Sequence, residues 1–279
     1  MRTARQASFG TLVFLLLLVC FSVPIDWLIL KNKHMTPGLT VLLMWSPGLA
    51  ALLTRLIRWE GLADVSFRLG GGRGAKALLL AWIFPLGAGV CAYGSGWLLG
   101  AGHFSGTPVA FAQRLLLAMT LALIDGGIMA LGEELGWRGY LLPRFCEARI
   151  PMPILLTSLI WAVWHYPLIW AGVYGQQGSL TVLLPLFTVS CIAAGFVTAR
   201  LRLWSGSIWP AVLFHATWNS VIQLAFDAFT VPKNLWLGES GILVAVFSAT
   251  GAFLLCRPGG LLFATDHSAQ RTESPKNPP

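Results

Sequence analysis

The sequence has little charge, few cysteines and no heptad repeat. Charged residues make up only 11% of the 279 positions, whereas 56% are hydrophobic. A water-soluble globule needs more polar surface than this composition supplies. The scarcity of charge also excludes a disordered chain, and the missing heptads exclude a coiled coil. The class that remains is a polytopic membrane protein.

Five scattered cysteines without a C-x-x-C pair exclude a disulfide scaffold and supply no metal or redox motif. Nineteen Lys and Arg against eleven Asp and Glu give a net charge of +8. In a membrane protein the position of these charges matters more than their sum. We therefore expect the lipid bilayer, and no nucleic acid, as the partner of this positive charge.

Eight apolar segments approach the ~20 residues that a helix needs to cross a ~30 Å hydrocarbon core. The sequence predicts an all-α, polytopic transmembrane helical bundle of about eight spans. The first segment resembles a signal peptide, but it contains Pro24 and Asp26 and has no small-residue cleavage site, so we expect a retained span. The predicted spans are 9–30, 38–57, 76–99, 113–136, 152–173, 180–199, 207–227 and 241–256.

The basic residues predict how the bundle is oriented. With the N-terminus inside, 15 of the 19 Lys and Arg fall in inner segments and three in outer ones, while Arg114 lies at a boundary. Lys and Arg are held preferentially on the cytoplasmic side. We therefore predict a multi-pass membrane protein with both termini in the cytoplasm. Its compact loops are typical of a protein of the bacterial plasma membrane.

The fourth predicted span ends in two adjacent acids. Ionisable groups inside a bilayer are costly, so each suggests a function and a partner. Glu134 and Arg138 stand four residues apart in the order that favours an intrahelical ion pair. Glu133 lies about 100° around the helix axis and cannot share that pair equally. A desolvated carboxylate beside a like charge suits a general base.

Two later spans each carry a histidine. His165 lies mid-span among aromatic residues, and His215 precedes Asn219 by one helical turn on the same face. Asn219 could orient His215, hold a substrate carbonyl or join two helices through a hydrogen bond. Each signal is weak alone, but a glutamate pair and two histidine-bearing spans together favour a catalytic site.

These motifs resemble the CPBP family of intramembrane proteases, which includes the type II CAAX prenyl endopeptidases. The resemblance lies in Glu133-Glu134-x-x-x-Arg138, Trp161-x-x-x-His165 and His215-x-x-x-Asn219, in the family's order, and covers roughly residues 125 to 220. It implies an endopeptidase that cleaves a membrane-associated peptide or protein substrate. Ser207-Ile208-Trp209-Pro210 also resembles the lead-in to the family's last histidine.

The resemblance implies a role for each motif residue. Glu133 would activate a water molecule, and His165 and His215 would position that water or stabilise the oxyanion. Asn219 would assist them. Glu134 and Arg138 would support the site.

The resemblance also suggests a division of the chain. Residues 1–112 would form three N-terminal spans with a basic inner loop, and 113–227 a catalytic membrane core. Residues 228–264 would hold the last span, and 265–279 a disordered tail.

The sequence leaves the metal requirement open. Glu133, His165 and His215 could form a His₂Glu zinc site with Glu134 as the base. The chain lacks H-E-x-x-H, however, and its histidines stand on different spans. We therefore favour a glutamate-dependent site with no certain cofactor, in which any zinc would be labile.

Two other classes of protein remain open. A transporter could use the same buried groups as a proton relay, and Asp26, Asp125 and Asp227 support that alternative because they lie outside the motifs. A non-catalytic scaffold could retain the motifs for packing. Mutation of Glu133 would distinguish these classes: loss of substrate cleavage would indicate an enzyme, and loss of transport would indicate a transporter.

Overall fold

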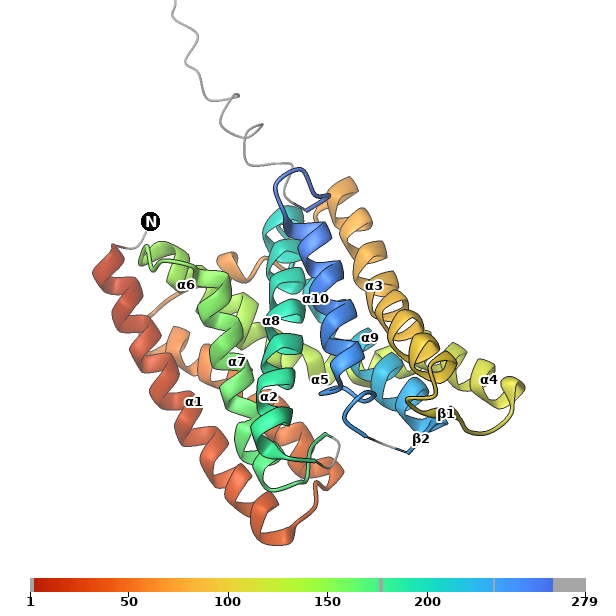
Figure 1. The fold of residues 1–279 in the computed structure, drawn as a ribbon. Coiled ribbons are helices and arrows are strands. Elements are labelled where there is room, and N and C mark those ends of the chain that lie inside the picture. The colour runs from red at the N-terminus through yellow and green to blue at the C-terminus, as the bar shows by residue number, and fades with distance from the viewer. Residues whose placement is uncertain (1–2, 176–177, 233, 263–279) are drawn as a thin grey trace, which may run out of the picture.

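The computed structural model describes residues 3–175, 178–232 and 234–262, which form a bundle of helices (Figure 1). The predicted all-α bundle is confirmed. The predicted tail, 265–279, lies outside the described residues. The α-helices are α1 (Ala4–Asn32), α2 (Pro37–Ile57), α3 (Gly71–Leu98), α4 (Pro108–Met119), α5 (Ala122–Gly136), α6 (Leu142–Glu147), α7 (Pro153–Trp170), α8 (Leu180–Ser205), α9 (Trp209–Trp218) and α10 (Ile242–Cys256).

Short elements complete the fold. Among the described residues, two 3₁₀ turns, two π-helices and one antiparallel pair of strands connect or extend the α-helices. The π-helices directly follow the motif-bearing helices α5 and α9. The short elements are η1 (Ala63–Val65), η2 (Trp137–Leu141), η3 (Asn219–Phe226), η4 (Asp227–Phe229), β1 (His103–Phe104) and β2 (Thr230–Val231).

The predicted count of eight spans is not confirmed. In the part of the chain that the structure describes, five helices are long and apolar enough to cross a membrane. The number rises to six if Pro108–Met119 and the helical segment Ala122–Glu147, which are bent by 45°, form one span. The predicted span 207–227 is divided between the ten-residue helix α9 and the π-helix η3. Helix α10 has 15 residues. Apolar composition therefore overestimated how many segments continue as one long helix.

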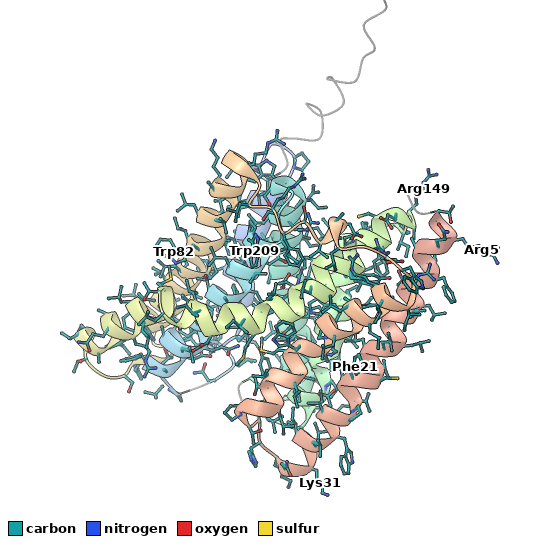
Figure 2. The ribbon with its side chains drawn as sticks, turned by 180° about the vertical axis from the view of Figure 1, so that it is seen from behind. Arg5, Phe21, Lys31, Trp82, Arg149 and Trp209 are labelled. Carbon is teal, nitrogen blue, oxygen red and sulfur yellow. The ribbon has the colours of Figure 1, made fainter. Side chains whose placement is uncertain are left out.

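Basic residues gather at one end of the bundle, as the loop count predicts. Figure 2 shows Arg5 and Arg149 at the same end and Lys31 at the opposite end. The basic end also holds the loop between α2 and α3 and the turn between α8 and α9 (Figure 1). Which end faces the cytoplasm stays a prediction.

Helices α2 and α5 cross closely because both present glycine at the contact. A methyl group on Gly48 would lie 2.6 Å from the carbonyl oxygen of Gly132, and one on Gly132 would lie 2.8 Å from that of Met44. Small residues let two helix backbones approach in this way. The crossing fixes the position of α5 directly before its two glutamates.

Candidate active site

The two glutamates at the end of α5 are both buried. Glu133 is 2% exposed and Glu134 is fully buried. As neighbours on a helix they point in different directions. Each carboxylate consequently meets its own set of donors.

Glu134 joins the helices α5 and α9. Its Oε1 atom accepts a hydrogen bond from Arg138 Nη1 at 2.9 Å, so the predicted ion pair is present. The same oxygen lies 2.9 Å from His215 Nδ1. Because Oε1 belongs to a carboxylate paired with arginine, we assign the proton to the imidazole nitrogen, which donates. Glu134 therefore orients His215, a role for which Asn219 was one sequence-based candidate.

Glu133 is held by two indole groups. Its Oε2 atom accepts hydrogen bonds from Trp161 Nε1 at 2.8 Å and Trp137 Nε1 at 3.2 Å. Its other oxygen, Oε1, lies 3.9 Å from His215 Nε2. A gap of that size between polar atoms suits a bridging water. The indoles thus fix one carboxylate oxygen and leave the other facing the histidine.

His165 comes from α7 and is oriented by its own helix. Its Nδ1 atom lies 2.9 Å from the carbonyl oxygen of Trp161, which can only accept, so Nδ1 carries a proton. Aromatic rings surround the imidazole, with the Trp164 ring centred 4.8 Å away and the Phe187 ring 5.2 Å away. Because Nδ1 is engaged, Nε2 is the nitrogen left for chemistry.

Four of the motif residues line one small cavity. His165, His215 and Asn219 all line it, and its volume of about 30 Å³ is sufficient for a water molecule. Asn219 begins the π-helix η3 and is half-buried. The structure thus brings the predicted histidines and asparagine together, with Glu133 beside His215. The two histidines, Asn219 and Glu133 are therefore close enough to act on one small molecule such as water.

Residues 115–221 match the model of a family described as type II CAAX prenyl endopeptidase Rce1-like. This segment of the chain is similar to that family. This confirms the resemblance predicted from the motifs, and all seven residues named in the motifs lie inside the match. No curated protein and no solved structure matches the chain. The Rce1-like family supports a hydrolase of the protease class that acts on a membrane-associated peptide, in a chain built as a membrane protein.

A third carboxylate at the cavity was missed by sequence reasoning. Glu239 is 7% exposed, lines the cavity with the two histidines, and lies outside the Rce1-like segment. Its Oε1 accepts from Trp218 Nε1 at 3.1 Å, and its Oε2 accepts from the Tyr174 hydroxyl at 2.7 Å and Gln223 Nε2 at 3.0 Å. All three donors are neutral. An acid within an otherwise apolar stretch, Leu235 to Val246, was the signal available.

Tyr174 remains a hydrogen-bond donor to this carboxylate. It lies in the loop after α7, and burial together with the neighbouring Glu239 raises its pKa well above the usual range. The hydroxyl is therefore protonated at neutral pH. Its ring centre lies 5.5 Å from that of His165, so the tyrosine connects Glu239 to the histidine side of the cavity.

The zinc site considered from the sequence is not confirmed. Within residues 3–175, 178–232 and 234–262, no group of three or more His, Cys, Asp or Glu is placed to hold a metal ion. The donor types of Glu133, His165 and His215 suit zinc, and the Nδ1 atoms of both histidines have the oxygen partners that zinc-bound histidines need. The three groups are nevertheless not assembled as a ligand set, so we assign no step to a metal.

Asp26, Asp125 and Asp227, the acids that supported the transporter alternative, do not line the cavity. Asp26 is buried in α1, and Asp125 is exposed on α5. Asp227 accepts a hydrogen bond from the Tyr93 hydroxyl. They therefore occupy three different environments.

Proposed function

We propose that this protein is an intramembrane endopeptidase that hydrolyses a peptide bond of a membrane-associated substrate, with Glu133 as the general base. One observation carries the proposal: a buried carboxylate oxygen of Glu133 lies 3.9 Å from His215 Nε2, beside a cavity with room for water, within the Rce1-like segment. Peptide hydrolysis needs an activated water, a base and donors for the developing oxyanion.

The hydrolytic water is proposed to lie between Glu133 Oε1 and His215 Nε2. Glu133 takes a proton from this water while the water oxygen attacks the scissile carbonyl carbon. The carbonyl electron pair moves to the oxygen and forms an oxyanion. The tetrahedral intermediate then breaks its C–N bond, and Glu133 returns the proton to the leaving amine.

The two histidines are proposed to have different roles. His215 lies between the carboxylates of Glu133 and Glu134, which favours its doubly protonated form. In that form Nε2 donates, so His215 and the amide of Asn219 can stabilise the oxyanion. His165 already donates from Nδ1, so its Nε2 accepts a hydrogen bond from the water and orients it.

Glu134 and Arg138 are proposed to be supporting residues. Arg138 neutralises Glu134. The Arg138 guanidinium carbon lies over the Trp161 ring, 4.5 Å from the ring centre. Trp161 in turn donates to Glu133. The pair therefore fixes the base through Trp161 and the histidine through Glu134.

We retain the larger division of the chain as part of the proposal. Residues 113–227 form the catalytic core, but Glu239 adds a contribution from 228–264. Residues 1–112 contact α5 through α2, where Gly48 and Gly132 let the two helices approach closely. We also retain a bacterial plasma-membrane location with both termini in the cytoplasm, on the basic-residue count.

The experiment compares Glu133→Gln with Asp125→Asn in purified full-length protein. Both substitutions remove one acid from α5, but Asp125 is exposed and does not line the cavity. The substrates are a farnesylated peptide with a C-terminal C-a-a-X sequence and the same peptide without the lipid. Mass spectrometry measures the released C-terminal tripeptide.

Glu133→Gln should reduce the rate by about 10² to 10⁴, the contribution of a general base. Asp125→Asn should cleave at the wild-type rate. Cleavage of the farnesylated peptide alone would define the substrate as prenylated. Undiminished cleavage by a folded Glu133→Gln variant would overturn the assignment of the base.

A further inference from the structure

A second cavity opens at the basic end of the bundle, apart from the one that holds the histidines. It lies between the loop at 62–68, helix α6 and the end of α8, and has a volume of about 690 Å³. We call it the arginine cavity, because Arg68, Arg138 and Arg202 contribute its three positive charges.

Two of these arginines have no acidic partner among the described residues. Arg202 is 8% exposed and donates from Nη2 to the backbone carbonyl of Asp64 at 2.7 Å. Its Nε atom is buried and has no hydrogen-bond partner in the described part of the chain. Arg68 donates to the carbonyl of Gly206 at 2.9 Å. Asp64 attracts Arg202 without forming an ion pair with it. A buried cation whose hydrogen bond goes to a neutral carbonyl is incompletely compensated, and an incoming anion would complete the compensation.

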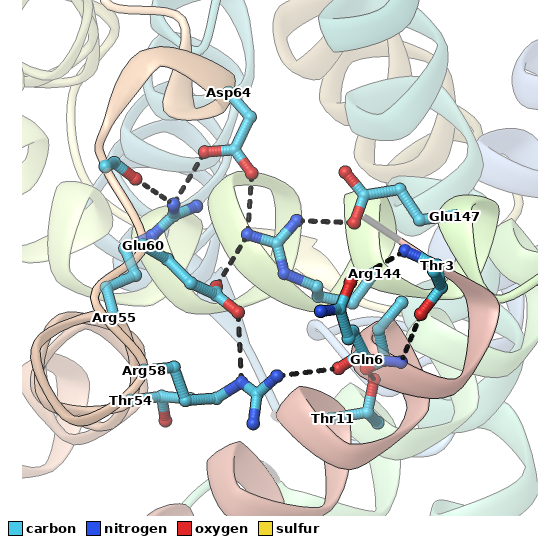
Figure 3. Close-up of polar contacts among 12 residues, drawn as sticks. Thr3, Gln6, Thr11, Thr54, Arg55, Arg58, Glu60, Asp64, Arg144 and Glu147 are labelled. Carbon is cyan, nitrogen blue, oxygen red and sulfur yellow. Dashed lines mark hydrogen bonds and ion pairs between the residues drawn. The ribbon is translucent and has the colours of Figure 1, made fainter. Parts of the chain in front are cut away.

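The two acids in the cavity wall, Asp64 and Glu147, already form ion pairs with arginines that do not line the cavity. Figure 3 shows Asp64 between Arg55 and Arg144, with Glu147 also bonded to Arg144. The Arg55–Asp64 distance is 2.6 Å, and the Arg144–Asp64 distance is 2.7 Å. These carboxylates therefore do not compensate Arg68 and Arg202 by direct ion pairs.

The rim of the cavity is apolar. Leu62, Phe67 and Leu203 line it and are 48%, 41% and 49% exposed. A small soluble anion would leave these side chains uncovered. An anion attached to acyl chains would cover them while its charge reached the arginines.

We propose that the arginine cavity binds the phosphate group of an anionic phospholipid. Basic pockets between helices at a membrane surface suit this chemistry, since each arginine near the headgroup contributes attraction. Arg138 forms part of the wall and also pairs with Glu134, so the bound phosphate lies directly behind the residues that hold His215.

The experiment measures lipid binding by the full-length protein in detergent, with native mass spectrometry as the readout. Phosphatidylglycerol is titrated against phosphatidylcholine with the same acyl chains, and inorganic phosphate is tested separately at constant ionic strength. The variants are Arg202→Gln and Arg68→Gln. Arg149→Gln is the matched control, because Arg149 is exposed at the same end but does not line the cavity (Figure 2).

Phosphatidylglycerol should bind more tightly than phosphatidylcholine, and each cavity variant should weaken it about fivefold. Arg149→Gln should leave binding unchanged. If Arg202→Gln does not fold, Arg68→Gln at the exposed rim and the charge-retaining Arg202→Lys provide the test.

Competition by inorganic phosphate that is lost in Arg68→Gln would support recognition of the phosphate group, whereas binding of inorganic phosphate without any preference between the two lipids would assign a soluble phosphate ester and overturn the lipid. Equal binding of the two lipids, or equal weakening by Arg149→Gln, would overturn the proposal. Because binding is measured, failure of the peptidase assay would not affect this result.

Discussion

Glu134 and Glu239 are two buried carboxylates near the same pair of histidines, and they are stabilised in opposite ways. Glu134 is fully buried and accepts from a charged arginine and from a histidine. Glu239 is 7% exposed and accepts from an indole, a phenol and an amide. The first is compensated by charge and the second by neutral donors.

The difference bears on the roles that we propose for the residues around the cavity. Glu134 accepts hydrogen bonds from Arg138 and from His215, so it orients the histidine while its own charge is compensated by cationic donors. Glu239 lines the cavity and accepts hydrogen bonds from Tyr174 and Trp218, which are both neutral. We therefore expect removal of one donor to be more costly at Glu134 than at Glu239.

The largest effect should come from breaking the charged pair. Arg138→Gln leaves Glu134 buried without its cation, and such a break typically costs about 3–5 kcal/mol of unfolding free energy. The variant should therefore have a much lower midpoint of thermal unfolding in detergent than the wild type. Arg149→Gln, an exposed arginine at the basic end, should unfold like the wild type. Similar stability of all three proteins would show that the ion pair contributes little.

The next effect concerns activity. Glu134→Gln keeps the shape of the side chain but removes the charge that pairs with Arg138 and favours protonated His215. We expect the rate to fall about ten- to a hundredfold, less than the ~10²–10⁴ expected for loss of the base Glu133. Peptide cleavage under saturating substrate measures this. A Glu134→Gln variant that is inactive beside an active Glu133→Gln variant would reverse the two roles.

A smaller loss of stability is expected at Glu239, whose donors are all neutral. Tyr174→Phe removes one of three donors to Glu239 and leaves Trp218 and Gln223 in place. A hydrogen bond to a charged group is worth about 1.5–3 kcal/mol, and the remaining donors favour the lower end of that range. The midpoint temperature of thermal unfolding of Tyr174→Phe should thus lie between that of the wild type and that of Arg138→Gln. If Tyr174→Phe lowered the midpoint of thermal unfolding as much as Arg138→Gln does, the neutral donors of Glu239 would be as important as the charged donor of Glu134, against our expectation.

The contrast also explains what could be read from the sequence. The Glu134–Arg138 pair was predictable because both residues lie on one helix at a fixed spacing. The shared face of His215 and Asn219 followed from the same periodicity. The bond from His215 to Glu134 was not predictable, because it depends on the packing of α5 against α9, 81 residues apart in the sequence.

Other features depended on packing in the same way. Glu239 lies in a segment between η4 and α10 whose position no helical period determines. Its donors come from the α7–α8 loop, α9 and η3. The predicted count of eight spans is also not confirmed, since an apolar run such as 207–227 does not reveal the change from α-helix to π-helix at Asn219. Apolar runs predicted where helices lie but not where they bend or end.

Asp64 extends the comparison to a partly exposed acid outside the spans, and its effect should be the smallest. Burial favours its neutral form, but hydrogen bonds and charge interactions with Arg55 and Arg144 outweigh burial, and its pKa is lowered. A lowered pKa in the folded state stabilises the protein above the unfolded value of about 3.9. That contribution is lost as the pH falls through the lower, folded pKa. The wild type should therefore unfold at a higher temperature than Asp64→Asn at pH 7 and pH 5, and the gap should narrow below about pH 4. A gap that stays constant down to pH 3 would show that Asp64 acts through packing and not through its charge.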